Sequence, residues 1–115
     1  MIQRFHGTPL LHGAVHHGNT VYLCGATAED KSAGMGAQTT QALDKVAKWL
    51  KHFGSDRTLM LNAMIYTTDM SQIGELNEAW AAWFNGADQP TRAAIGVADL
   101  GPGTLIEIVV TAALR

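Results

Sequence analysis

The sequence predicts one domain, residues 1–115, that combines α-helices and β-strands in the order β-β-β-α-β-α-β-β. Short segments of β-branched and alternating apolar residues predict the strands, because the side chains of a half-buried strand alternate between two faces. Two longer segments repeat apolar residues every three or four positions, the pattern of a helix packed on one side. No linker or internal repeat divides the chain, whose 115 residues suit a single core.

Three strands are expected before the first helix. The third, Val21–Gly25, is the clearest because β-branched and aromatic residues dominate it, and residues 17–19 are typical of a turn from an earlier strand. Residues 2–5 and 13–15 are weaker strand candidates. Residues 29–36 are polar and contain glycine, which predicts a surface loop leading into a helix.

Two helices and an intervening strand follow. We predict a helix over Ala37–Phe53 that stops at Gly54, and a strand over Leu59–Thr68. Ser71 is a suitable N-cap for a second helix, which Asn85 and Gly86 end. The residues expected to face the core are Leu43, Val46, Ala47, Leu50 and Phe53, then Leu61, Ala63 and Ile65, then Ile73, Leu76, Trp80, Trp83 and Phe84.

The last quarter of the chain contains two strands separated by the loop Gly101-Pro102-Gly103. Their apolar faces are Ala93, Ile95 and Val97 in the first strand and Ile106, Ile108 and Val110 in the second. If both faces lie under the helices, the strands form a hairpin that pairs Ile95 with Ile108 and Gly96 with Glu107.

In that register Arg92, Ala94, Gly96 and Glu107 share the face away from the helices. Arg92 and Glu107 lie about 13 Å apart along the strands, and the small residues between them leave a trough. An unpaired charge on a buried strand is costly, so we predict a site with an anionic group on Arg92 and a reacting atom near Glu107. Two structural alternatives stay open: an ion pair between the strands, or a Glu107 that faces solvent on a one-sided sheet.

Charge and composition exclude several classes of protein. The net charge is −2 and the eight Lys and Arg residues are scattered, which argues against non-specific nucleic-acid binding and gives no support to RNA contact. The single Cys24 cannot form an internal disulfide, and no apolar run approaches the roughly 20 residues needed to span a membrane. Residues 1–6 lack the apolar stretch of a signal peptide, so we expect a cytoplasmic protein.

Three other groups of residues favour structural roles. His12, His16 and His17 are clustered in sequence without a nearby carboxylate pair, so no metal site is predicted. Cys24 is expected to be a small buried thiol rather than a nucleophile. The tryptophans, expected to pack in the core rather than stack on bases, are Trp49, Trp80 and Trp83.

Four segments, in order along the chain, carry a family resemblance. They are Gly18 to Gly25, Asn77 with the following Glu-Ala-Trp-Ala-Ala-Trp-Phe, Pro90 to Ala93, and Leu105 to Ala113. Together they resemble the Rid family of reactive intermediate deaminases, also called the YjgF family. The Pro-x-Arg motif and the final Glu-Ile strand are the most specific part of this resemblance.

The resemblance implies a chorismate-mutase-like α+β domain: a mostly antiparallel six-stranded sheet, two helices on one face, and a homotrimer with clefts between subunits. It implies hydrolysis of 2-imino acids, or their enamine tautomers, to 2-keto acids and ammonia, with no cofactor. Arg92 matches the residue that binds the substrate carboxylate, and Glu107 matches the acid that orients or activates water. Asn77 and Cys24 match polar positions that line the cleft.

Two positions depart from the family pattern. Many active deaminases have a tyrosine where this chain has Leu10-Leu11-His12, and a cysteine where it has Ala94. We hypothesise that His12 supplies the missing polar contact. The alternative to a deaminase is a non-catalytic trimer that binds or senses a small carboxylate, and ribonuclease activity fits an acidic chain poorly.

Overall fold

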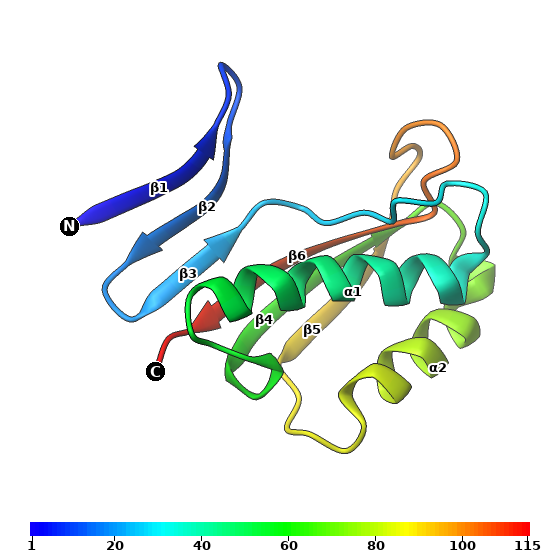
Figure 1. The fold of residues 1–115 in the computed structure, drawn as a ribbon. Helices are drawn as coiled ribbons and strands as arrows, with labels where there is room; N and C mark the ends of the chain where they lie inside the picture. Colours follow the sequence, from blue (N-terminus) through cyan, green and yellow to red (C-terminus); the bar gives the residue numbers. More distant parts are fainter.

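The computed structural model describes all 115 residues and consists of one six-stranded sheet with two helices on one side (Figure 1). The predicted order of elements is confirmed. The strands are β1 (Ile2–Gly7), β2 (His12–His17), β3 (Thr20–Leu23), β4 (Met60–Thr67), β5 (Thr91–Gly96) and β6 (Ile106–Ala113). The helices are α1 (Met35–His52) and α2 (Ile73–Phe84), with short 3-10 turns η1 (Arg57–Leu59) and η2 (Met70–Gln72). Neither helix is long and apolar enough to cross a membrane.

The order of strands across the sheet is β1-β2-β3-β6-β4-β5. All neighbouring strands are antiparallel except β4 and β5, which are parallel because α2 forms the crossover between them. The predicted hairpin of the last two strands is therefore wrong: β4 lies between them, and Ile95 pairs with Tyr66 rather than with Ile108. Every second residue of β6 is fully buried, which suits a strand paired on both sides.

The core lies between the sheet and the helices. Ile65 and Ile108, paired across β4 and β6, are completely buried beneath the helices. Leu61 was predicted to face the core but is 49% exposed, because a bulge between Met60 and Asn62 shifts the alternation of β4. The helix residues that fill the core include Leu43, Val46 and Leu50 of α1 and Leu76, Trp80 and Phe84 of α2.

The helix ends differ slightly from expectation. Helix α1 begins at Met35, two residues before the predicted start, and Gly54 follows it with a φ of 71°. Ser71 is not the N-cap of α2. Instead the carboxylate of Asp69 accepts the Ser71 N–H and caps η2, which leads directly into α2. Asn85 ends α2, as predicted, and adopts the left-handed conformation.

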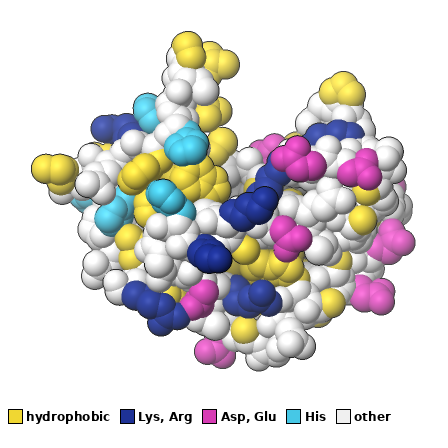
Figure 2. All heavy atoms as spheres, in the orientation of Figure 1, with side chains coloured by type: hydrophobic (Ala, Val, Ile, Leu, Met, Phe, Trp, Pro, Cys, Tyr) yellow, Lys and Arg dark blue, Asp and Glu magenta, His cyan; other side chains and the backbone are white.

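The β1–β2 hairpin extends beyond the helix-covered part of the sheet (Figure 1). Aromatic contacts join it to the end of α1: His6 lies edge-on to Trp49, and His16 lies edge-on to Phe53. Trp49 therefore has a packing role, as expected, at the contact between α1 and the hairpin. Figure 2 shows histidine side chains gathered around this hairpin, beside the lysine side chains of α1. No cluster of three or more His, Cys, Asp or Glu side chains is placed to hold a metal ion.

Candidate functional site

Arg92 lies on the edge strand β5 and points toward α2. It pairs with Ala63, which is fully buried on the helix side, and paired residues of adjacent strands project from the same face. Arg92 Nη2 donates a hydrogen bond of 2.6 Å to Asn77 Oδ1, and its guanidinium carbon lies 5.2 Å from the centre of the Trp80 ring. Helix α2 therefore supplies both groups that contact the guanidinium.

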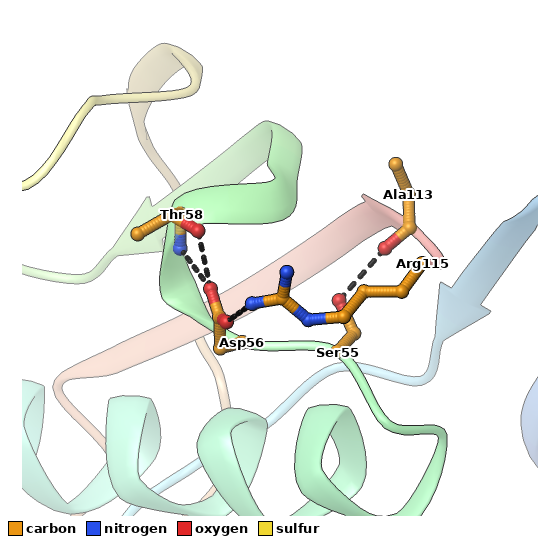
Figure 3. Close-up of polar contacts among 5 residues, drawn as sticks. All are labelled: Ser55, Asp56, Thr58, Ala113 and Arg115. Carbon is orange, nitrogen blue, oxygen red and sulfur yellow. Dashed lines mark hydrogen bonds and ion pairs between the residues drawn. The ribbon is translucent and has the colours of Figure 1, made fainter.

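The positive charge of Arg92 has no carboxylate partner within the chain. The two ion pairs of the structure join Lys45 to Glu29 and Arg115 to Asp56. Figure 3 shows the second, which fixes the end of the chain to the turn after α1 together with a hydrogen bond from the Ser55 hydroxyl to the Ala113 carbonyl. The structural alternative of an Arg92–Glu107 ion pair is thus excluded within one chain, and Arg92 remains free to bind an external anion.

Glu107 lies on the other side of the sheet. Its neighbours Ile106 and Ile108 are completely buried beneath the helices, so alternation turns Glu107 to the face that the helices do not cover. There it pairs with Tyr66 of β4, and its side chain is half-buried. The Glu107 carboxylate makes no hydrogen bond or ion pair within the chain.

The Glu107 side chain packs closely against the backbone of Gly25. A Cβ atom at Gly25 would lie 2.8 Å from Glu107 Cδ and would also overlap a carboxylate oxygen. The segment is held there by Ala26, which exchanges two backbone hydrogen bonds with Ile108. A larger residue at position 25 would therefore displace the Glu107 carboxylate. Gly25 ends the predicted strand Val21–Gly25 and was given no role there, although a glycine within a strand often marks such a close approach.

Arg92 and Glu107 therefore occupy opposite faces of the sheet, and the predicted shared face is wrong. The error lies in β5, where the apolar Ala93 and Ile95 were assumed to face the helices. Instead Ile95 is 40% exposed on the open face, and the smaller alternating residues face α2 and η2. Gly96 lies beside η2, where a Cβ would make an ordinary van der Waals contact with the Met70 methyl group at 3.8 Å.

The remaining predicted residues divide between the two faces. Ala94 and Gly96 share the side of Arg92, but that side faces the helices and Glu107 lies on the other, so the predicted trough between the two charges is wrong. Asn77 contacts Arg92 directly. Cys24 adjoins Gly25 on the Glu107 side and is exposed, so its expected burial is wrong. His12 is exposed at the start of β2 opposite Gly7, and no hydrogen bond links it to either charged residue.

The open face carries large apolar side chains beside Glu107. Tyr22 of β3 is 50% exposed, and the half-buried residues Met64 and Val109 pair with each other across β4 and β6. No element of the chain covers this face (Figure 1). A one-sided sheet with so much apolar surface is typical of a protein that associates with another protein surface.

These features define a class: an α+β domain in which the unpaired cation of Arg92 and the unpaired carboxylate of Glu107 lie on opposite faces of a single sheet. The family model described as Endoribonuclease L-PSP matches residues 2–114. A YjgF-family protein from Neisseria meningitidis has the same fold with a TM-score of 0.91 and 32% identity, over 100% of this chain and 96% of that chain.

Two relatives support the same assignment by sequence. A RutC family protein from Haemophilus ducreyi is 33% identical over 89% of this chain and 86% of its own length. The 2-iminobutanoate/2-iminopropanoate deaminase of Rattus norvegicus is 33% identical over 77% of this chain and 69% of its own length. The chain belongs to this family, which is also known by the names YjgF, RutC and Rid.

Proposed function

We propose that the protein hydrolyses 2-imino acids, or their enamine tautomers, to 2-keto acids and ammonia in clefts between the subunits of a chorismate-mutase-like homotrimer. One observation carries the proposal: a fixed, unpaired arginine and a half-buried, unpaired glutamate lie on opposite faces of one sheet. A single chain cannot bring them to one small molecule. Association with a second copy can, if Arg92 of one subunit meets Glu107 of another.

Arg92 is suited to bind the substrate carboxylate. Asn77 accepts one N–H of the guanidinium and Trp80 covers one side of it, which leaves the other N–H groups for a ligand. Two parallel hydrogen bonds from a guanidinium to a carboxylate fix both distance and orientation. The small residues Ala94 and Gly96 leave room beside the bound acid.

Glu107 is suited to move protons during hydrolysis. Its carboxylate would accept a proton from water as the water oxygen bonds to the imine carbon, and would pass this proton to the imine nitrogen, which gives a carbinolamine. The carboxylate then takes the proton of the new hydroxyl group as the C=O bond forms and passes it to the nitrogen, so that the C–N bond breaks and ammonia leaves. The Glu107 carboxylate ends in its starting state, and no cofactor is consumed.

The apolar open face supports assembly into a trimer. Burial of Tyr22, Met64 and Val109 against another subunit would remove apolar surface from water and shield Glu107 on the same face. The name of the rat relative, an iminobutanoate and iminopropanoate deaminase, agrees with the proposed reaction.

Decay of a 2-imino acid generated in the assay by an amino-acid oxidase tests the proposal. The wild-type protein should accelerate decay, whereas Arg92→Ala and Glu107→Ala should each reduce it to the rate in buffer. Arg57→Ala is the matched control, because Arg57 also lies over a tryptophan of α2 but over Trp83, whose backbone carbonyl it binds. Wild-type decay no faster than buffer would contradict the proposal.

A second function is favoured by position 94. The chain has Ala94 where many active deaminases have a cysteine, so one functional group beside the arginine is missing. A non-catalytic trimer would keep the Arg92 carboxylate site and lose hydrolysis. Binding of 2-oxobutanoate by a wild-type protein that does not accelerate imine decay would support this function instead.

A further inference from the structure

We infer that Trp80, held in place by Gln89, is a positioning residue that orients the Arg92 guanidinium for a planar carboxylate. This inference rests on the proposed function, because it assigns to Trp80 a role in the same site. Arg92 is exposed on an edge strand, where a long side chain would otherwise sample many rotamers. A fixed aromatic surface restricts those rotamers and attracts the cation.

The Trp80 ring is held in one position by its surroundings. Its side chain is only 5% exposed, and its indole N–H donates a hydrogen bond of 2.7 Å to Gln89 Oε1. The ring packs against Phe84 one turn further along α2, with centroids 4.9 Å apart. Gln89 lies two residues before β5 begins, so its hydrogen bond ties the indole to the segment that leads to Arg92.

Asn77 and Trp80 restrain the guanidinium in two different ways. Asn77 Oδ1 accepts from Nη2 at 2.6 Å and fixes the direction of one N–H, while the ring lies 5.2 Å from the guanidinium carbon and limits tilting. The two residues are three positions apart on α2 and therefore on the same side of the helix. Neither contact neutralises the charge, so Arg92 is held without losing its affinity for an anion.

Helix α2 contains a second pair of this kind that serves as an internal control. The Arg57 guanidinium lies 4.4 Å from the centre of the Trp83 ring, but Arg57 Nη1 donates to the Trp83 backbone carbonyl. The indole of Trp83 donates to Asp44 of α1. The Arg57–Trp83 pair therefore connects α2 to η1 and α1, whereas the guanidinium of the Arg92–Trp80 pair has no carboxylate partner.

The experiment measures binding of 2-oxobutanoate by calorimetry and the Arg92 Nε–H signal by NMR in four variants. Trp80→Leu, which removes the aromatic face, should weaken binding about tenfold. Trp80→Phe keeps a face and should retain most of the affinity, Gln89→Ala should give an intermediate loss, and Trp83→Leu should bind like wild type. The Arg92 Nε–H signal should move in Trp80→Leu and stay in place in Trp83→Leu.

Wild-type affinity together with an unmoved Arg92 signal in Trp80→Leu would overturn the inference. If Trp80→Leu does not fold, Gln89→Ala carries the test, and wild-type affinity together with an unmoved Arg92 signal in that variant would overturn the inference equally. A wild-type protein that binds no 2-oxobutanoate would contradict the proposed function alone. The Arg92 signal needs no ligand, so it would still report whether Trp80 orients the guanidinium.

Discussion

The Arg92 half and the Glu107 half of the proposed site are built differently. Arg92 is held by side chains of the same chain, Asn77 and Trp80, on the face that the helices cover. Glu107 packs against the backbone of Gly25, on a face that no element of the chain covers. The binding half is thus complete in one chain, while the acid half needs another surface to enclose it.

The difference shows what a single sheet can and cannot do. Successive side chains of a strand project to opposite faces of the sheet. One sheet can therefore hold Arg92 on one face and Glu107 on the other, where the two charges cannot form an ion pair. This separation keeps both groups available for a ligand. It also makes their cooperation depend on assembly, and changes on one face should leave the other face largely intact.

The largest effect on stability is expected on the helix-covered face. Ile108→Ala removes a completely buried side chain and should lower the free energy of unfolding by about 2–5 kcal/mol. Val109→Ala, one residue along on the open face, should cost about 1 kcal/mol or less in a dissociated subunit, where Val109 is only half-buried. Urea unfolding at a protein concentration low enough to dissociate the proposed trimer measures both, and equal losses would contradict the contrast between the faces.

A change at Gly25 should damage the acid half alone. In Gly25→Ala the new Cβ displaces the Glu107 carboxylate, so the hydrolysis rate should fall about a hundredfold, a typical contribution of a positioned acid or base. Affinity for 2-oxobutanoate should stay close to wild type because Arg92 lies on the other face. Weak binding with an intact rate would show that the two halves are assigned the wrong way round.

A change at Asn77 should damage the binding half alone. Asn77→Ala removes a hydrogen bond to a charged group, which contributes about 1.5 kcal/mol or more, so carboxylate affinity should fall about tenfold. The maximal rate at saturating substrate should change much less, since Glu107 is untouched. Steady-state kinetics measure KM and kcat separately, and a loss confined to kcat would argue against a role for Asn77 in binding.

Replacing Asp69 should have the smallest effect on the protein. Its carboxylate caps η2, which leads into the helix that carries Asn77 and Trp80. Hydrogen bonds from the Ser71 side chain and then from Gln72 hold the pKa of Asp69 below its ordinary range. The ionised form is favoured in the folded state, so its stabilisation is complete above about pH 4 and is lost as the pH falls through the lowered pKa. Melting temperature against pH should show this acid step in wild type and a smaller one in Asp69→Ala.

Most of the fold could be predicted from local patterns. Helical stripes identified α1 and α2, and alternation identified the buried face of β6 and most of β4. Local patterns do not encode which strands are neighbours. The last two strands follow each other in sequence, but the α2 crossover places β5 beside β4 and leaves β6 to pair with β3 and β4.

The same limit explains what was and was not predicted of the site. Arg92 and Glu107 were identified as unusual charges on apolar strands, and both are unpaired in the structure. Their relative placement depended on the facing of β5, where Ile95 turned out to be partly exposed at the sheet edge. The roles of Gly25 and Trp80 depend on contacts between segments distant in sequence or in different elements, which alternation does not reveal.

Subunit complementation tests most directly whether Arg92 and Glu107 of different subunits form one site. Arg92→Ala and Glu107→Ala proteins, each inactive alone, are unfolded together in equal amounts, refolded, and assayed for imine hydrolysis. Random mixing in a trimer gives about one intact site in four, so the account predicts about a quarter of the wild-type rate. A mixture that stays inactive, although mixed trimers are detected by native mass spectrometry, would contradict it.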